Sequence, residues 1–336
     1  MKHPPLERAR AEARRERPDR DLARATVLAT LVLGGLSLAS CGNYSNEDLE
    51  FLNALPQTDD VSMEAPLRSA VRLVDEDDAL RTTTRVTTLE NAAAAGALGF
   101  IDEIRATDPS ARQPNVRIWG PFPDDRNPGW KVKFEMTRSL ASDGVTPHFA
   151  YRLVMIAPAG TTFGTATDPT SETEVLAGWF ERAGPVAGAQ GHLVLSPKEA
   201  RDAGAFLKDL EKLVTFTVDY DNRSWPRSLV VTIVNEPPAD PTTEAASATY
   251  TYERSQNGDG AMTFTFLEDA VPGPLGVDTL DITSRWHGTG EGRARVSVLA
   301  GDGAGVSWVD CWASTSLTSY NSRTGEGDLS TCISEL

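Results

Sequence analysis

Between residues 130 and 312 the sequence is dominated by short runs in which apolar and polar residues alternate. In "WKVKFEM", for example, Trp130, Val132, Phe134 and Met136 alternate with charged residues. Alternation with a period of two places the apolar side chains on one face of a β-strand. Turn-forming stretches such as "QNGDG", "TGEG" and "GDGAG" separate the later runs. The pattern predicts about ten to twelve strands joined mainly by hairpins, and therefore an antiparallel sheet with one packed face.

A long amphipathic helix is predicted before the first strands. Over residues 88–105, Leu89, Ala93, Phe100 and Ile104 recur at helical spacing on one face. This spacing predicts a helix of about 18 residues with one apolar stripe. Such a stripe must be buried, and we expect it to pack against the sheet.

Two further stretches carry the signature of a helix start. Ser45 is followed three residues later by Asp48, and Ser196 is followed at the same spacing by Glu199. In a capping box the two side chains each hydrogen-bond the backbone of the other residue. The expected fold is therefore mainly β with α (α+β): a large curved antiparallel sheet, or open half-barrel, of about ten to twelve strands packed with two or three helices.

The first 40 residues differ from the rest of the chain. An arginine-rich segment precedes an uncharged run, residues 25–40. A basic segment, an apolar run and then small residues form a secretory signal peptide, and the run is shorter than the roughly 20 residues needed to span a bilayer. We expect a signal peptide at 1–40, an acidic tether with a short helix at 41–85, and one β-rich domain at 86–336, with a subdivision near residue 240 as the alternative.

The end of the apolar run, Leu38-Ala39-Ser40-Cys41, resembles a bacterial lipobox. This resemblance implies cleavage before Cys41 and attachment of a diacylglycerol to its thiol. Gly42 follows instead of aspartate, which by the enteric sorting rule favours the outer membrane. We therefore expect a cell-envelope protein that is anchored to the membrane through a lipid on Cys41. The alternative is a buried helix that ends in Ala-Ser-Cys by chance.

The two remaining cysteines are Cys311 and Cys332. An even pair in an oxidising compartment predicts a disulfide, with two free buried thiols as the alternative. The C-terminal runs "RWHGTGEGRARVSV", "VDCWASTSLTSY" and "GEGDLSTC", together with the early "YSNEDLEFLNALP", resemble uncharacterised lipoproteins of myxobacteria. That resemblance implies export and the same cysteine pairing, and it carries no function.

Charge and motif content argue against several classes of function. The formal net charge of −16 opposes binding to the phosphate backbone of nucleic acids. The sequence has none of the usual zinc spacings and no Gly-x-Ser-x-Gly nucleophile motif. We therefore expect no catalytic residue, no metal and no cofactor. The stretches "DYDN" and "NGDG" are read as turns, with calcium binding as the weaker alternative.

Histidines and tryptophans remain as candidate site residues. His148, His192 and His287 lie far apart in the sequence, so we expect three surface or edge histidines, with convergence on one site as the alternative. Most of the tryptophans are expected to fill the core of the sheet. Trp308 and Trp312 are the better candidates for an outward aromatic face, which would suit sugar binding.

These observations favour a non-catalytic binding or structural role in the envelope. One alternative is a periplasmic or surface carrier of lipid or another apolar ligand, held between the sheet and the helix that contains Phe100. By architecture alone, this arrangement is similar to the periplasmic lipoprotein-carrier fold. A second alternative is a surface hydrolase with scattered carboxylates. A deep apolar cavity would favour the carrier, a cleft of carboxylates or histidines the hydrolase, and a filled interior the binding or structural role.

Overall fold

The structure is a computed structural model of the chain. It describes residues 45–66, 79–165, 168–182, 188–207, 210–237, 247–268, 270–271, 273–274, 277–315 and 317–334. The predicted signal peptide and Cys41 lie outside these residues. The fold class, mainly β, is confirmed.

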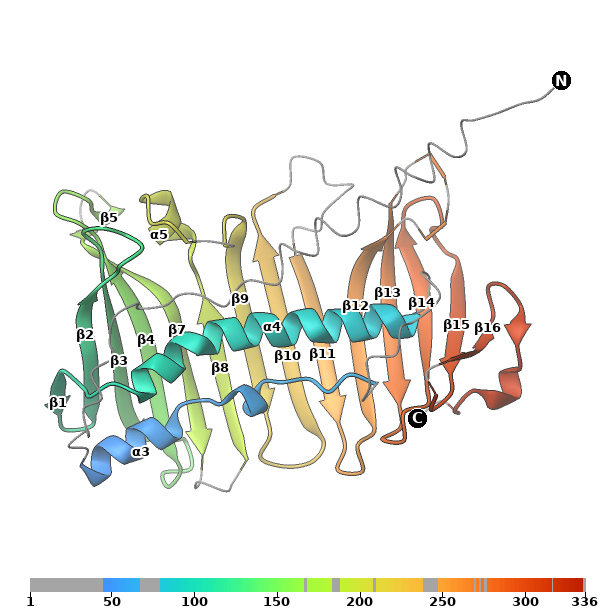
Figure 1. Ribbon diagram of the computed structural model, residues 1–336, viewed down its shortest axis with the longest axis horizontal. Coiled ribbons are helices and arrows are strands. Elements are labelled where there is room, and N and C mark those ends of the chain that lie inside the picture. The colour runs from blue at the N-terminus through green and yellow to red at the C-terminus, as the bar shows by residue number, and fades with distance from the viewer. Residues whose placement is uncertain are drawn as a thin grey trace.

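Fifteen strands form one open antiparallel sheet, in which each strand lies beside its neighbours in the chain (Figure 1). The only insertion in this order, among the described residues, is the two-stranded hairpin of β5 and β6 between β4 and β7. The strands of the sheet are β1 Ala111–Gln113, β2 Val116–Pro123, β3 Lys131–Leu140, β4 Pro147–Ile156, β7 Glu172–Arg182, β8 Ala189–Leu195, β9 Leu213–Asp221, β10 Arg227–Asn235, β11 Ser247–Arg254, β12 Gly260–Glu268, β13 Asp278–Trp286, β14 Gly292–Ala300, β15 Ser307–Trp312, β16 Thr318–Asn321 and β17 Glu326–Gly327, and the inserted hairpin is β5 Phe163–Thr165 and β6 Asp168–Thr170.

The hairpin connections are confirmed, but the predicted count of about ten to twelve strands is too low. The stretch "QNGDG" joins β11 to β12, with Arg254 paired to Gly260, and "TGEG" joins β13 to β14, with Trp286 paired to Gly292. The additional strands are short ones such as β1, β5 and β17, which have two or three residues each. Alternation over so few residues gives no readable period.

The two faces of the sheet differ in polarity. On the inner face, Phe134, Leu153, Phe216 and Ile282 are among the side chains that are almost fully buried. The outer face carries polar residues, for example the cross-strand row of Thr251, Thr263 and Thr283. One packed face and one wet face are what half-buried alternation implies.

Large aromatic side chains on the inner face lie opposite glycines of the neighbouring strand. A Cβ atom on Gly260 would lie 2.3 Å from the ring of Trp286, and one on Gly292 would lie 2.2 Å from the ring of Trp312. The ring therefore occupies the space that a side chain would need, and it shields the glycine backbone. Among the described residues, an aromatic ring covers a directly opposite glycine in four cross-strand pairs: Tyr151–Gly178, Tyr220–Gly191, Trp286–Gly260 and Trp312–Gly292.

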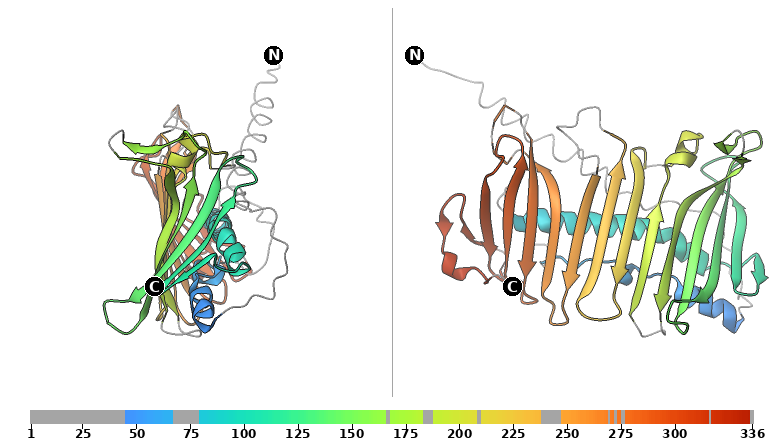
Figure 2. Two further views of the ribbon diagram at one scale, coloured as in Figure 1. Left: turned by 90° about the vertical axis from the view of Figure 1, so that its left-hand side faces the viewer. Right: turned by 180° about the vertical axis from the view of Figure 1, so that it is seen from behind.

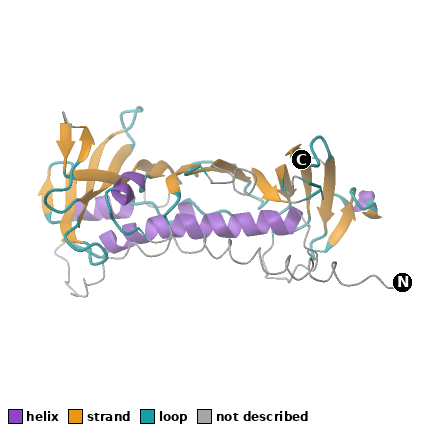
Figure 3. Ribbon diagram, turned by 90° about the horizontal axis from the view of Figure 1, so that it is seen from above, coloured by secondary structure: helices purple, strands orange, loops and turns teal. Residues whose placement is uncertain are grey.

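The inner face is covered by α4, Ala79–Arg105, which crosses the strands along most of the sheet (Figures 1 and 3). The helix therefore includes nine residues before the predicted start at residue 88. Its first turns are rich in threonine, which is a poor helix former. In the structure Thr83 and Thr87 donate hydrogen bonds to backbone carbonyls four residues earlier, at 2.7 and 2.8 Å. The side chain of Phe100 lies outside the described part of the chain.

Residues 45–66 also pack on the inner face, beside α4 (Figure 2). Helix α3, Asn46–Ala54, begins with the predicted capping box, since the Ser45 amide donates to Asp48 at 2.9 Å and the Asp48 amide donates to Ser45 at 3.1 Å. Residues 55–66, which we call the strap, continue from it and contain the short helix η1, Thr58–Asp60. The boundary drawn between residues 85 and 86 thus falls inside α4.

The sheet continues across the Pro-rich connection near residue 240, because β10 and β11 pair directly. The capping box expected at Ser196 does not form: the Ser196 amide donates to the Val175 carbonyl, and Glu199 accepts from the Thr173 hydroxyl at 2.7 Å. The helix there, α5, is short and spans Lys198–Asp202, and a second short helix, η2, spans Leu329–Thr331.

Candidate functional site

The structure joins Cys311 and Cys332 in a disulfide with a Cα–Cα distance of 5.4 Å. Cys311 is buried in β15, and Cys332 follows η2, so the bond ties the C-terminal segment to the sheet. Cys41, the predicted lipidation site, lies outside the described residues.

The outward aromatic face expected at Trp308 and Trp312 is not present. The two side chains are 6% and 1% exposed and point to the inner face. The Trp312 ring lies against Gly292, and its Nε1 donates to the Gly290 carbonyl at 3.1 Å. The prediction was wrong because parity separates the two faces of a strand without saying which face is the inner one.

The three histidines each face a carboxylate, and they lie on different strands or turns. The Nδ1 atom of His148 is 2.9 Å from Glu181, and that of His192 is 2.6 Å from Asp219. His287 follows β13 and lies 3.3 Å from Asp259, which precedes the neighbouring strand β12. Among the described residues no group of three histidine, cysteine, aspartate or glutamate side chains is arranged to hold a metal ion.

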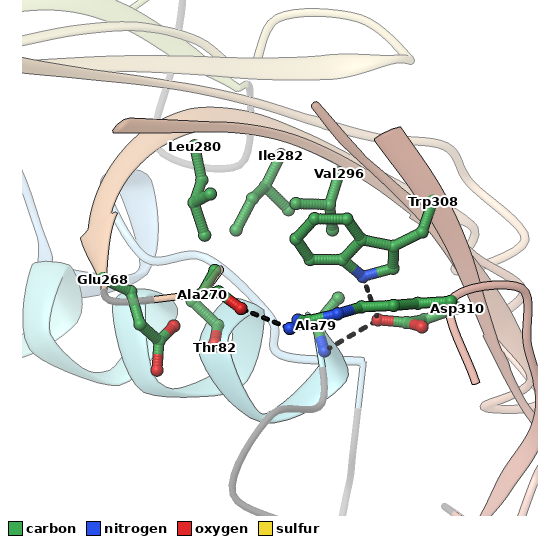
Figure 4. Close-up of a pocket in the computed structure, with 10 residues that line it drawn as sticks. Ala79, Thr82, Glu268, Ala270, Leu280, Ile282, Val296, Trp308 and Asp310 are labelled. Carbon is green, nitrogen blue, oxygen red and sulfur yellow. Dashed lines mark hydrogen bonds between the residues drawn. The ribbon is translucent and has the colours of Figure 1, made fainter. Parts of the chain in front are cut away.

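One cavity lies between the N-terminal end of α4 and strands β12 to β15 (Figure 4). Its apolar wall includes Leu280, Ile282 and Val296, and its polar side includes Asp310, which accepts from the Trp308 Nε1 at 3.3 Å. The cavity has a volume of about 20 Å³, which is room for about one water molecule. It is therefore too small to hold an acyl chain.

The rest of the described interior between α4 and the sheet is one continuous cluster of buried side chains. Leu80, Val86, Leu98 and Ile101 of α4 are all less than 4% exposed. Polar groups are buried among them: the Thr83 and Ser284 hydroxyls lie 2.6 Å apart.

Glu90 of α4 is also part of this interface, and its side chain is 5% exposed. Its Oε2 atom makes no hydrogen bond within the described part of the chain. Burial raises the pKa of Glu90 to about 8. Burial, and then the nearby charge of Glu90, raise the pKa of Tyr250 on β11.

A second cavity, of about 260 Å³, lies between the strap and strands β10 and β11, with Asn222 from the β9–β10 turn. Its lining is mostly polar and combines residues from the strap with residues from the sheet. The residues that line it are Asp59, Asp60, Ser62, Glu64, Asn222, Arg227, Ser228, Leu229, Tyr252 and Arg254. We call it the strap cavity.

Hydrogen bonds and ion pairs hold the strap over this cavity. Asp60 accepts from Arg182 at 2.6 Å, and Glu64 forms an ion pair with Arg254. The Glu64 amide donates to the Tyr252 hydroxyl at 3.0 Å, so the hydroxyl hydrogen remains able to donate elsewhere. These contacts fix two of the strap's carboxylates and leave the cavity open between the strap and the sheet.

Arg227 is the one guanidinium lining the cavity that has no ion pair among the described residues. It stands directly opposite Arg254 in the β10–β11 register. No sequence motif indicates this cavity. Its residues lie as far apart as Asp59 and Arg254, and no local spacing indicates that they meet.

Comparison of the chain with protein-family models, with curated proteins and with solved structures gives no match. Among the described residues, no helix is both long enough and apolar enough to cross a membrane. The geometry of the described cavities and surfaces is therefore the basis for any inference about function.

Proposed function

We propose that the protein is a lipid-anchored protein of the cell envelope, at the outer membrane, with a non-catalytic binding or structural role. The observation that carries the role is the filled interior: the described space between α4 and the sheet is occupied by close-packed side chains. The cavity at the end of α4 accommodates only about one water molecule. The anchor is supported by the basic segment, the apolar run and the lipobox-like ending at Cys41.

Replacing Cys41 with serine is expected to abolish acylation, because the hydroxyl cannot take the place of the thiol that receives the lipid. The variant should lose radiolabelled palmitate incorporation and leave the membrane fraction, since acyl chains supply the anchoring energy. Cys332→Ser, which keeps Cys41, is the matched control and should stay labelled. Equal labelling of the wild type and Cys41→Ser would contradict the anchor.

A second candidate function is the carriage of a lipid or another apolar ligand. Its support is the architecture, in which a single sheet layer lies along one side of one long helix (Figure 3). In this alternative the sheet acts as an open half-barrel and α4 as a lid that moves away to admit the ligand.

Titration with a fluorescent fatty acid separates the two roles. A filled interior offers no site, so we expect only weak, non-saturable fluorescence changes, equal to those given by an unrelated acidic protein. Saturable binding with one site per chain would favour the carrier and contradict the filled-interior argument.

A further inference from the structure

We propose that the strap cavity binds a small molecule with a single carboxylate group, and that Arg227 is the residue that receives this carboxylate. The inference specifies a ligand for the binding role proposed above and rests on that role.

The cavity wall contains two arginines with too few acceptors. Arg227 and Arg254 are directly opposite each other on β10 and β11, and like charges in that position are unfavourable. Glu64 pairs with Arg254. Arg227 has no such partner in the described chain, and the Nε atoms of both arginines are buried without a hydrogen bond. An anion between the strap and the sheet would give the Arg227 guanidinium, which lines the cavity, the charged partner that it lacks.

The Arg227 guanidinium is already held in position. It lies over the ring of Trp225, 4.4 Å from the ring centroid. Stacking on an aromatic face orients the planar group while leaving its N–H donors at the edge free. A group held in this way loses little additional freedom when a ligand binds, which favours affinity.

The other cavity residues restrict the ligand to a monoanion with a short apolar part. Asp59, Asp60 and Glu64 of the strap place three carboxylates around the cavity, so a dianion would be repelled. The Tyr252 hydroxyl has a hydrogen to donate to a carboxylate oxygen. Leu229, which is 4% exposed, adds an apolar surface to the wall. A volume of about 260 Å³ suits a small molecule and excludes a long chain.

Isothermal titration of the full-length chain in detergent with propionate tests the proposal. Wild type is expected to show saturable binding, and Arg227→Gln is expected to bind about tenfold more weakly or worse, because charge-assisted hydrogen bonds are lost. Arg223→Gln is the control: Arg223 is in the same turn region, pairs with Asp221 at 2.7 Å, and does not line the cavity. Its affinity should equal that of wild type.

Two further measurements, with Arg227→Lys and with inorganic phosphate, test the carboxylate site even if Arg227→Gln folds poorly. Arg227→Lys keeps the charge and should bind propionate more tightly than Arg227→Gln. Inorganic phosphate should bind wild type at least about tenfold more weakly than propionate, because of the surrounding carboxylates. Absence of propionate binding to wild type, equal affinities of the two Arg227 variants, or tighter phosphate binding would each overturn the proposal.

The outcomes also separate this inference from the proposed function. Palmitate labelling of Cys41 reports the anchor and does not depend on the strap cavity. Palmitate labelling without propionate binding would contradict the ligand inference alone and would leave a structural role for the protein. Propionate binding without palmitate labelling would contradict the lipid anchor and would leave the binding site in the strap cavity. NMR of the propionate after incubation should show it unchanged, and chemical conversion would contradict a non-catalytic role.

Discussion

Replacing Asp48 with alanine is expected to lower the free energy of unfolding by about 3 kcal/mol, because the buried Arg117 guanidinium loses its one buried carboxylate partner and keeps only the half-exposed Glu47, at 2.8 Å. Asp48 is fully buried, Arg117 is 2% exposed, and the Arg117 Nε lies 2.5 Å from the Asp48 carboxylate. Asp48 also accepts from Arg112 at 3.0 Å and from the Ser45 amide at 2.9 Å, so the same change removes one of the two hydrogen bonds of the capping box of α3. Loss of a buried ion pair and loss of half of a capping box thus coincide at one residue.

Urea unfolding of Asp48→Ala and Glu50→Ala measures this effect against a matched control. Glu50 lies on the same helix and pairs with Arg138 at 2.8 Å, but both side chains are at least 30% exposed. A surface pair of this kind contributes about 0–1 kcal/mol. Similar losses in the two variants would show that the buried pair has no special role.

The ion pair at Asp48 also has a predictable dependence on pH. Burial alone would raise the pKa of Asp48, but hydrogen bonds from Ser45, Arg117 and Arg112 outweigh it and hold the pKa well below its usual value. Because the pKa is lower in the folded state, the stabilisation is present at neutral pH and is lost only as the pH falls below about 4. Measurements between pH 5 and pH 9 therefore leave this pair charged.

Between pH 5 and pH 9, the substitution Glu90→Gln is expected to remove much of the pH dependence of the free energy of unfolding. The pKa of Glu90 is raised by burial to about 8 in the folded protein. The folded state therefore holds the proton more tightly than the unfolded state does. The stabilisation is full below the unfolded pKa and is lost as the pH rises toward about 8, by up to roughly 5 kcal/mol for a shift of about 3.5 pKa units.

Urea melts of wild type and Glu90→Gln at pH 5 and pH 8.5 test this expectation. The two proteins should be similar at pH 5, where the buried carboxyl is neutral, and the variant should be the more stable at pH 8.5. Glu253→Gln, an exposed change on β11, is the control and should follow wild type at both values. A difference between wild type and Glu90→Gln that is the same at both pH values would contradict the buried, protonated state.

The elements that the sequence predicts well are those specified by residues close together in the chain. The capping box of Ser45 and Asp48 involves residues three apart, and the turns "QNGDG" and "TGEG" involve a few consecutive residues. Alternation likewise identified strands such as β3, whose Val132, Phe134 and Met136 are all buried. In each case the physical cause lies within one hairpin or one helical turn.

The features that the sequence did not predict depend on long-range packing. The early turns of α4 contain threonines that disfavour a helix, and they are stabilised by the sheet, as in the contact between Thr83 and Ser284. Trp308 and Trp312 were placed on the wrong face because only the assembled sheet distinguishes the inner face. The strap cavity requires the strap to cross strands that occur far later in the chain, so its charges appear unrelated in the sequence.

The sequential strand order also has a consequence for how the chain can fold. Synthesis proceeds from the N-terminus, so α4 is complete before any strand of the sheet exists. Contacts near its C-terminal end span few residues, as from Trp119 to the Thr107 carbonyl, with a separation of 12, whereas Ala79 at its other end meets Asp310 across 231 residues. Between these ends, Thr87 meets Met262 across 175 residues. Each new hairpin need only join the strand before it, which keeps the entropy cost of each loop closure small. The sheet can therefore form strand by strand from β1 to β17 on the surface of α4, which is already present.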